Sequence, residues 1–164
     1  MAFSVVAARF CARRPTAFTV TKTGWPWHRD LTVTDASGAA VMRVDDRSFL
    51  SRRSVLLDAA SRPVLIVQRR PSLFEVRRTW KAFEGDSTSS EDLLFSAVVR
   101  PSLTNTGDIH VHLHGERRRD FVVVRPWYRR TDCAVTHAGA AVAQIECSGG
   151  FLCQKRPYIM RQRK

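Results

Sequence analysis

Hydrophobic and polar residues alternate over short stretches of this chain, and turn-forming residues separate the stretches. Residues 31–33 and 41–44 alternate in this way on either side of Asp35-Ala-Ser-Gly38. Such short alternation predicts β-strands, because successive side chains of a strand face opposite sides of its sheet. Aspartate caps a tight turn with its carboxylate, and glycine adopts a positive φ without steric penalty. The stretch therefore predicts a β-hairpin.

The same pattern recurs further along the chain. Residues 54–57 and 64–67 flank Asp58-Ala-Ala-Ser-Arg62, whose aspartate aligns with that of the first turn. A weaker third copy joins residues 133–135 to 140–145 through His137-Ala-Gly139. Three hairpins with similar turns favour a repetitive antiparallel sheet. A chance occurrence of small residues in turns is the alternative.

The remaining strand candidates complete an all-β pattern. Further strands are predicted at 93–100, 109–114 and 121–125, and the polar stretch 85–92 predicts a loop. Residues 72–83 stay ambiguous, because their hydrophobic positions fit either a helix face or a strand. No other long helix is indicated, so the chain is expected to be an all-β barrel or sandwich.

Length and charge narrow the class of protein. The 164 residues suit one domain. No apolar run exceeds four residues, whereas a transmembrane helix needs about 20. The net charge is +12, but residues 1–29 and 147–164 each carry five basic residues and no acidic one. Basic ends suggest nucleic acid or anionic lipid as a partner, with a solvated surface as the alternative.

The cysteines and the N-terminus bear on the compartment. None of the four cysteines forms a Cys-x-x-Cys pair, which argues against a zinc ribbon and favours reduced thiols. The N-terminus lacks the basic region of a secretory signal, although residues 1–29 have the arginine-rich, acid-free composition of a transit peptide. We expect a cytoplasmic protein, either free, peripheral at a membrane or nuclear.

The most conspicuous candidate for metal binding is a row of alternating histidines. His110, His112 and His114 would share one face of a strand, where neighbouring imidazoles suit Zn²⁺ or Cu²⁺. The alternative is that the aliphatic residues between them pack inward while the histidines face water. No cysteine or carboxylate stands at an obvious complementary spacing, so we predict no metal and no cofactor.

Motifs of catalysis are not found. The chain has no Gly-x-Ser-x-Gly nucleophile motif and no glycine-rich phosphate loop that leads into a helix. We therefore predict a protein that is not an enzyme.

Basic clusters are the stronger functional signal. A guanidinium group binds phosphate oxygens in pairs, so clustered arginines can hold a phosphoinositide headgroup or a nucleic-acid backbone. The acidic residues between them weaken the case for nucleic acid, and each pair can also be read as a solvated strand end. The candidate ligands of an anionic headgroup are Arg52, Arg53, Arg69, Arg70, Arg77, Arg78 and Lys81.

Three blocks of residues, in their order along the chain, resemble the plant LURP-one-related family, and the similarity covers residues 5–146. The N-terminal residues also resemble the start of that family, which argues against a transit peptide. The blocks are Val55-Leu-Leu-Asp-Ala-Ala60, Trp80-Lys-Ala-Phe-Glu-Gly-Asp86 and Asp92-Leu-Leu-Phe-Ser96.

The resemblance implies a tubby C-terminal-like antiparallel β-barrel around a central hydrophobic helix, similar to tubby domains and phospholipid scramblases. It implies a role near membranes, such as phosphoinositide binding or membrane-tethered, defence-associated regulation. It supplies no catalytic residue. A scramblase-like lipid-handling role and a nucleic-acid-associated regulator are the alternatives.

The resemblance fails at the C-terminus. Residues 147–164 form a basic segment without a hydrophobic helix. We therefore expect an incomplete barrel domain over residues 5–146 that lacks its last strands and central helix, followed by an unmatched tail. A truncated, non-functional product is one interpretation. The sequence does not define an oligomeric state.

Overall fold

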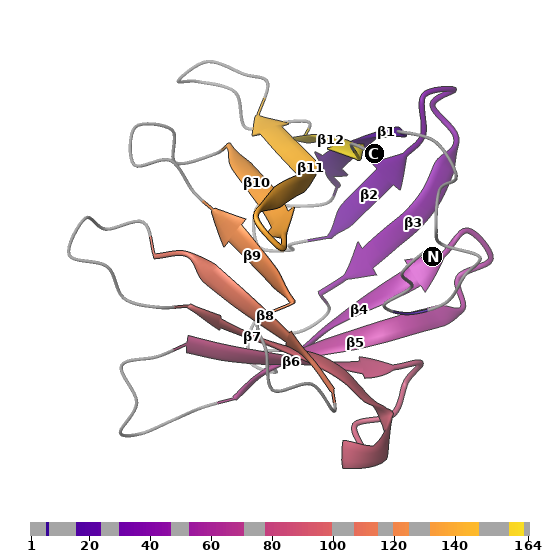
Figure 1. Ribbon diagram of the computed structural model, residues 1–164. Helices are drawn as coiled ribbons and strands as arrows, with labels where there is room; N and C mark the ends of the chain where they lie inside the picture. The colour runs from indigo at the N-terminus through magenta and orange to yellow at the C-terminus, as the bar shows by residue number, and fades with distance from the viewer. Residues whose placement is uncertain are drawn as a thin grey trace.

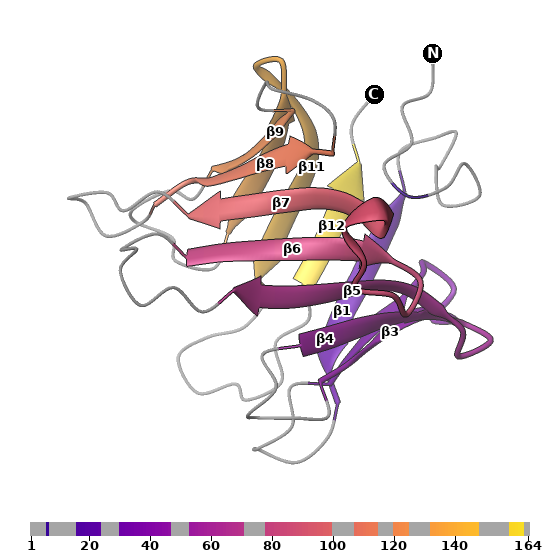
Figure 2. The ribbon, with the colours of Figure 1, turned by 90° about the horizontal axis from the view of Figure 1, so that it is seen from below.

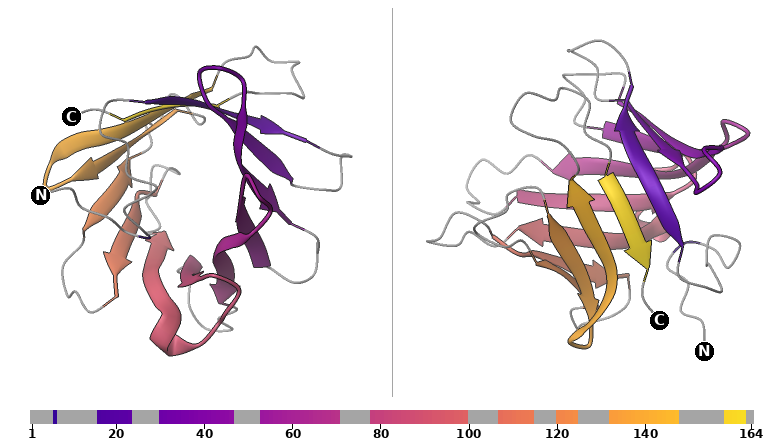
Figure 3. Two further views of the ribbon diagram at one scale, coloured as in Figure 1. Left: turned by 90° about the vertical axis from the view of Figure 1, so that its right-hand side faces the viewer. Right: turned by 90° about the horizontal axis from the view of Figure 1, so that it is seen from above.

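The strands of this protein close into one ring. A computed structural model describes residues 6, 16–23, 30–46, 53–70, 78–99, 107–114, 120–124, 132–147 and 158–162. In these residues twelve antiparallel strands form a closed barrel, and their order around the ring follows the chain (Figures 1 and 3). The last strand pairs with both the first and the eleventh, which closes the ring.

Nearly all of the regular structure is strand, as predicted. One short 3-10 helix, η2 (Ser90–Asp92), precedes the seventh strand, and the described ranges contain no other helix. The strands are β1 (Ala17–Lys22), β2 (Leu31–Thr34), β3 (Ala40–Asp45), β4 (Arg53–Asp58), β5 (Pro63–Arg70), β6 (Arg78–Glu84), β7 (Leu93–Val99), β8 (Ile109–Leu113), β9 (Phe121–Val124), β10 (Cys133–His137), β11 (Ala140–Cys147) and β12 (Tyr158–Gln162).

The strands predicted from alternation are confirmed. Each predicted stretch coincides with a strand of the barrel to within a few residues at its ends. The ambiguous segment becomes a strand over its second half, β6, while residues 72–77 lie outside the described residues. The hydrophobic spacing of this segment fits a helix and a strand equally well. Its pairing with β5 and β7 determines that it forms a strand.

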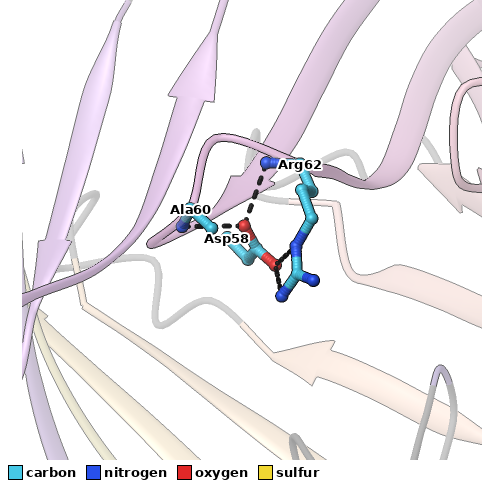
Figure 4. A network of polar contacts seen from close by, with 3 residues as sticks. All are labelled: Asp58, Ala60 and Arg62. Atoms are coloured by element: carbon cyan, nitrogen blue, oxygen red, sulfur yellow. Dashed lines mark hydrogen bonds and ion pairs between the residues drawn. The ribbon is translucent and has the colours of Figure 1, made fainter.

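The first two hairpins share one turn structure, as the repeat predicted. In the β2–β3 turn, Oδ1 of Asp35 accepts the backbone N–H groups of Ser37 and Ala39 at 2.9 and 3.0 Å. In the β4–β5 turn, Oδ1 of Asp58 accepts those of Ala60 and Arg62, both at 2.9 Å (Figure 4). Each aspartate thus satisfies two N–H groups that the tight turn leaves without a ladder partner.

Both of these turns need a left-handed residue at the same position. Gly38 has φ +83° in the first turn, and Ser61 has φ +60° in the second. Serine pays a steric cost that glycine avoids, because its Cβ crowds the backbone at positive φ. The second turn therefore keeps the geometry with a less suitable residue.

The third hairpin uses a different turn. His137 pairs directly with Ala140, so only Ala138 and Gly139 form the loop, and both have positive φ (49° and 83°). Two such residues are the signature of a type I′ turn. The third copy is therefore a hairpin, as predicted, but it does not repeat the aspartate-capped turn.

Register divides the strand residues between the two faces of the barrel wall, because directly opposed residues share a face. The exposed mid-strand side chains Arg43 and Gln68 lie on one face, which we assign as the outer face. The other face is strongly apolar, and we assign it as the inner face. Its members include Phe18, Val20, Leu31, Val33, Val44, Leu56, Val67, Trp80, Phe95, Val111, Val123, Val135 and Ile145.

The most deeply buried residues lie on β5 and β6. Ile66 and Ala82 are fully buried, and Val64, Leu65 and Phe83 are nearly so. These two strands are paired along most of their length, from Leu65 opposite Glu84 to Arg70 opposite Thr79. The core of the described structure is therefore centred on this strand pair.

The C-terminal segment departs from expectation. The sequence placed the end of the barrel at residue 146 and a tail over 147–164, but β11 continues to Cys147 and β12 (Tyr158–Gln162) joins the ring. The five residues of β12 form too short a pattern to be recognised, and their partner β1 lies at the other end of the chain. This non-local pairing supplies a strand that the sequence interpretation lacked.

Candidate functional site

The predicted arginines gather at one end of three adjacent strands. Arg53 begins β4, Arg69 and Arg70 end β5, and Arg78 begins β6. Because these strands run antiparallel side by side, the four backbone positions lie at the same end of the barrel (Figure 2). We call these four residues the basic end. Arg52 and Arg77 lie outside the described residues.

The basic residues are divided between the two faces of the wall. Arg53 lies opposite Gln68, and Gln68 lies opposite Lys81, so Arg53 and Lys81 share the outer face. Arg69 lies opposite Trp80 and therefore occupies an inner-face position, as does Arg78 two residues before Trp80. These four cations are thus divided equally between the two faces.

The outer face carries a row of polar side chains across five strands. Each member of the row is directly opposite the next, from β4 to β8. The members are Arg53, Gln68, Lys81, Ser96 and His112. Adjacent members stand about 4.8 Å apart, the spacing of neighbouring strands. The row contains cations and hydrogen-bonding groups but no carboxylate.

The cations of this region are largely uncompensated. Arg69, Arg78 and Lys81 form no ion pair with any residue that the structure describes. Arg53 donates from Nη2 to the carbonyl oxygen of Asp86 at 3.4 Å, a weak contact with a neutral group, so its guanidinium group reaches toward the β6–β7 turn. Positive charge at the basic end thus stays available to an external anion.

The opposite end, which we call the turn end, carries seven of the thirteen carboxylates that the structure describes. Asp58 binds Arg62 there, with Oδ2 at 2.9 Å from both Nε and Nη2, and Arg161 of β12 lies at the same end, opposite Ala17. At the end that holds the arginines, the described ends of β4–β7 carry no carboxylate, while Asp45 and Asp46 at the end of β3 and Asp108 before β8 flank them. The remaining carboxylates at that end are Asp30, Asp132 and Glu146. The turn-end carboxylates are Asp35, Asp58, Glu84, Asp86, Glu91, Asp92 and Asp120.

Two turn-end carboxylates are held in their charged form. The Ser37 hydroxyl, at 2.6 Å, and backbone N–H groups lower the pKa of Asp35. The Arg62 backbone N–H is the main cause that lowers the pKa of Asp58, and the Arg62 side chain adds to it. These charges stabilise the hairpin turns.

The histidine row lies on β8 and the residue after it, where the sequence predicted a strand. His110 and His112 alternate on the outer face of β8 as predicted, His114 follows the strand, and His110 is only 7% exposed. Across the ranges that the structure covers, no three His, Cys, Asp or Glu side chains come together in a way that could hold a metal ion.

A pocket that sequence reasoning missed lies on β2 and β3, beside the turn after β4. It has a volume of about 370 Å³. Its charged residues come from three separate segments, so no local motif indicates it. The lining residues are Thr23, Asp30, Thr32, Ala40, Met42, Arg43, Asp58 and Ala59.

The barrel contains no candidate for a membrane-crossing helix. No helix in the described part of the chain is both long and apolar enough to span a bilayer.

Known proteins share this architecture. An X-ray structure of an Arabidopsis thaliana protein is similar to the chain with a TM-score of 0.69 and 27% identity, over 97% of this chain and 86% of that one. Protein LURP-one-related 9 of Arabidopsis thaliana is 36% identical over 96 residues, which are 57% of this chain and 48% of the relative. The match thus spans about half the length of that relative.

The family match begins later than the sequence resemblance indicated, at residue 16 rather than 5, and extends further toward the C-terminus. A sequence model of the LURP-one-related family matches residues 16–160. The match passes beyond residue 146 and reaches into β12, in agreement with the place of that strand in the barrel. The chain therefore belongs to the LURP-one-related family.

Proposed function

We propose that this protein is a non-enzymatic module that binds anionic phospholipid surfaces, with phosphoinositide headgroups held at the basic end. The observation that carries the proposal is the gathering of Arg53, Arg69, Arg70 and Arg78 at one end of β4–β6, where the described ends of β4–β7 have no carboxylate. Guanidinium groups bind phosphate oxygens in bidentate pairs.

The charge distribution also supports one orientation on the membrane. Each basic residue near an anionic surface contributes about 1 kcal/mol of binding. The turn end is repelled by the same surface, because its seven described carboxylates outnumber its two described cations, Arg62 and Arg161. The basic end would face the lipid and the turn end the cytoplasm, where a tethered regulator of defence could meet its partners.

Vesicle sedimentation tests the proposal. Vesicles of phosphatidylcholine with a few per cent of phosphatidylinositol bisphosphate should retain the protein, and retention should fall as salt rises. The double variant R53E/R78E should reduce retention at least about 25-fold, because each lost cation costs about fivefold. The control is R43E, which reverses one charge at an exposed arginine of β3 outside the basic end and is compared with each of the single variants R53E and R78E.

Two results would contradict the proposal. The first is equal retention on pure phosphatidylcholine vesicles. The second is a loss in R43E as large as in R53E and in R78E. Retention on DNA that depends on Lys155 and Arg156 would favour the nucleic-acid alternative instead. These two residues should be substituted rather than removed by deleting 147–164, because the deletion would also remove β12.

A further inference from the structure

We propose a second ligand site, independent of the basic end, in the pocket on β2 and β3. It would bind a small zwitterion that carries one ammonium and one carboxylate group, such as an α-amino acid or a dipeptide. The volume of about 370 Å³ lies within the range of about 300–1,000 Å³ that small-molecule pockets occupy.

The pocket holds two opposite charges that do not neutralise each other. Arg43 is exposed and makes no hydrogen bond or ion pair with any residue in the described ranges. Asp30 accepts the backbone N–H of Asp46 on Oδ1 at 3.1 Å, and within those ranges it has no cationic partner. Both charges therefore remain available to a ligand of complementary charges.

Asp58, the third charged residue of the pocket, is bound by groups of its own turn. Asp58 uses Oδ1 for the N–H groups of Ala60 and Arg62, and Oδ2 for the Arg62 guanidinium. Its charge is compensated within its own turn, so it forms a wall of the pocket rather than a ligand. Arg43 is left to bind a carboxylate and Asp30 to bind an ammonium group.

The neutral lining residues extend this assignment. The hydroxyl oxygens of Thr23 and Thr32 lie 3.2 Å apart, and each keeps acceptor capacity for an ammonium N–H. Met42 also lines the pocket, but it lies opposite Val33 on the inner face, so its side chain and that of Arg43 are on opposite faces of β3. The ligand class is thus a small zwitterion.

Titration calorimetry with defined probes tests the ligand class. L-leucine and L-leucylglycine carry both charges, whereas leucinamide lacks the carboxylate and 4-methylpentanoate lacks the ammonium group. One or both zwitterions should bind saturably in the millimolar range or tighter. The single-charge analogues should bind at least about tenfold more weakly, because each lacks one charge-assisted contact. The stronger zwitterion distinguishes amino acid from dipeptide.

Variants test the two residues. R43M keeps the apolar stem of the side chain, and D30N keeps an acceptor for the Asp46 N–H. Each should weaken zwitterion binding by about 10- to 100-fold. The control R53A removes an exposed arginine outside the pocket and should leave this binding unchanged while it weakens vesicle retention.

The unmodified chain gives a readout that does not depend on the folding of variants. The methyl resonance of Thr32, which shares the outer face with Arg43, should shift on addition of L-leucine or L-leucylglycine. No saturable binding of either probe, or equal binding of the single-charge analogues, would overturn the proposal. An unperturbed Thr32 methyl, or wild-type affinity in folded R43M and D30N, would do the same.

Discussion

The two ends of the barrel use charge in opposite ways. At the turn end, Asp35 and Asp58 are bound by the N–H groups of their own turns, and Arg62 completes the second turn. At the basic end, Arg69 and Arg78 form no ion pair with described residues. Charge at the first end stabilises the fold, and charge at the second is available for binding.

This difference explains why the net charge says little about a partner. The net charge of +12 includes carboxylates that accept hydrogen bonds within hairpin turns. It also includes arginines that form no ion pair with described residues. Strand direction then separates them, because the aspartate-capped turns follow β2 and β4 while the arginines lie where β4 and β6 begin and β5 ends. A charge pattern along the sequence becomes a polarity of the wall across β4–β6.

Weakening the strands that join the two ends should have the largest effect on stability. β5 and β6 run from one end to the other, and Ile66 of β5 is fully buried on the face that it shares with Gln68, opposite Phe83 of β6. Ile66→Ala should destabilise the protein by about 2–5 kcal/mol through lost burial and the cavity left behind. Denaturant unfolding measures the change.

Val124→Ala is the matched control, because Val124 is 38% exposed on β9. It should change the free energy of unfolding far less than Ile66→Ala. Equal effects of the two substitutions would show that the β5–β6 pair is not the core of the barrel.

The turn end was largely predictable from the sequence. The contacts of Asp35 and Asp58 reach only two and four residues ahead, so a local motif contains all the groups involved. The third hairpin shows the limit of this reasoning. Gly139 repeats the glycine of the first turn, but His137 has no aspartate-like carboxylate to accept the turn N–H groups, and a shorter loop forms.

The basic end was predictable only in part. The clustered arginines are visible in the sequence, but their division between faces depends on register, in which Arg69 meets Trp80 and Arg53 meets Gln68. Register and the non-local pairing of β12 are set by contacts between distant segments. The zwitterion pocket was missed for the same reason, since Asp30 and Arg43 belong to different strands or their flanks.

Acid should weaken the turn end selectively. Hydrogen bonds lower the pKa values of Asp35 and Asp58 in the folded state, led by the Ser37 hydroxyl and the Arg62 backbone N–H respectively. A lowered folded pKa adds stability that is present above the unfolded value of about 4, and it is lost as pH falls through the folded pKa. D35A/D58A should therefore unfold at lower temperature at neutral pH than the wild type does.

The pH profile separates this mechanism from a general loss of stability. The melting temperature of D35A/D58A should fall less steeply than that of the wild type between pH 5 and the acid limit of folding. Removing Glu84, an exposed carboxylate at the same end, should leave the slope nearly unchanged. A wild-type slope in D35A/D58A would contradict the role assigned to the two carboxylates.

A smaller effect is expected at the left-handed position of the first turn. Gly38 has φ +83°, where a Cβ is strained although no atom lies within 4 Å of its place. Gly38→Ala should cost about 1 kcal/mol, because the strain of a left-handed alanine exceeds its entropic benefit in the unfolded chain. Unfolding in urea provides the measurement, and no loss of stability would show that the turn relaxes.

The reverse substitution in the second turn should have the smallest effect and the opposite sign. Ser61 already stands at φ +60°, close to the ideal left-handed value of about +57°, so glycine relieves less strain there than alanine creates at Gly38. Ser61→Gly should stabilise the protein by about 0.5 kcal/mol, since the flexibility of glycine in the unfolded chain offsets part of the gain. The Ser61 N–H donates to the Asp58 carbonyl oxygen at 2.9 Å, and glycine keeps that bond. A loss of stability in this variant would mean that the serine side chain, rather than the backbone geometry, holds the second turn.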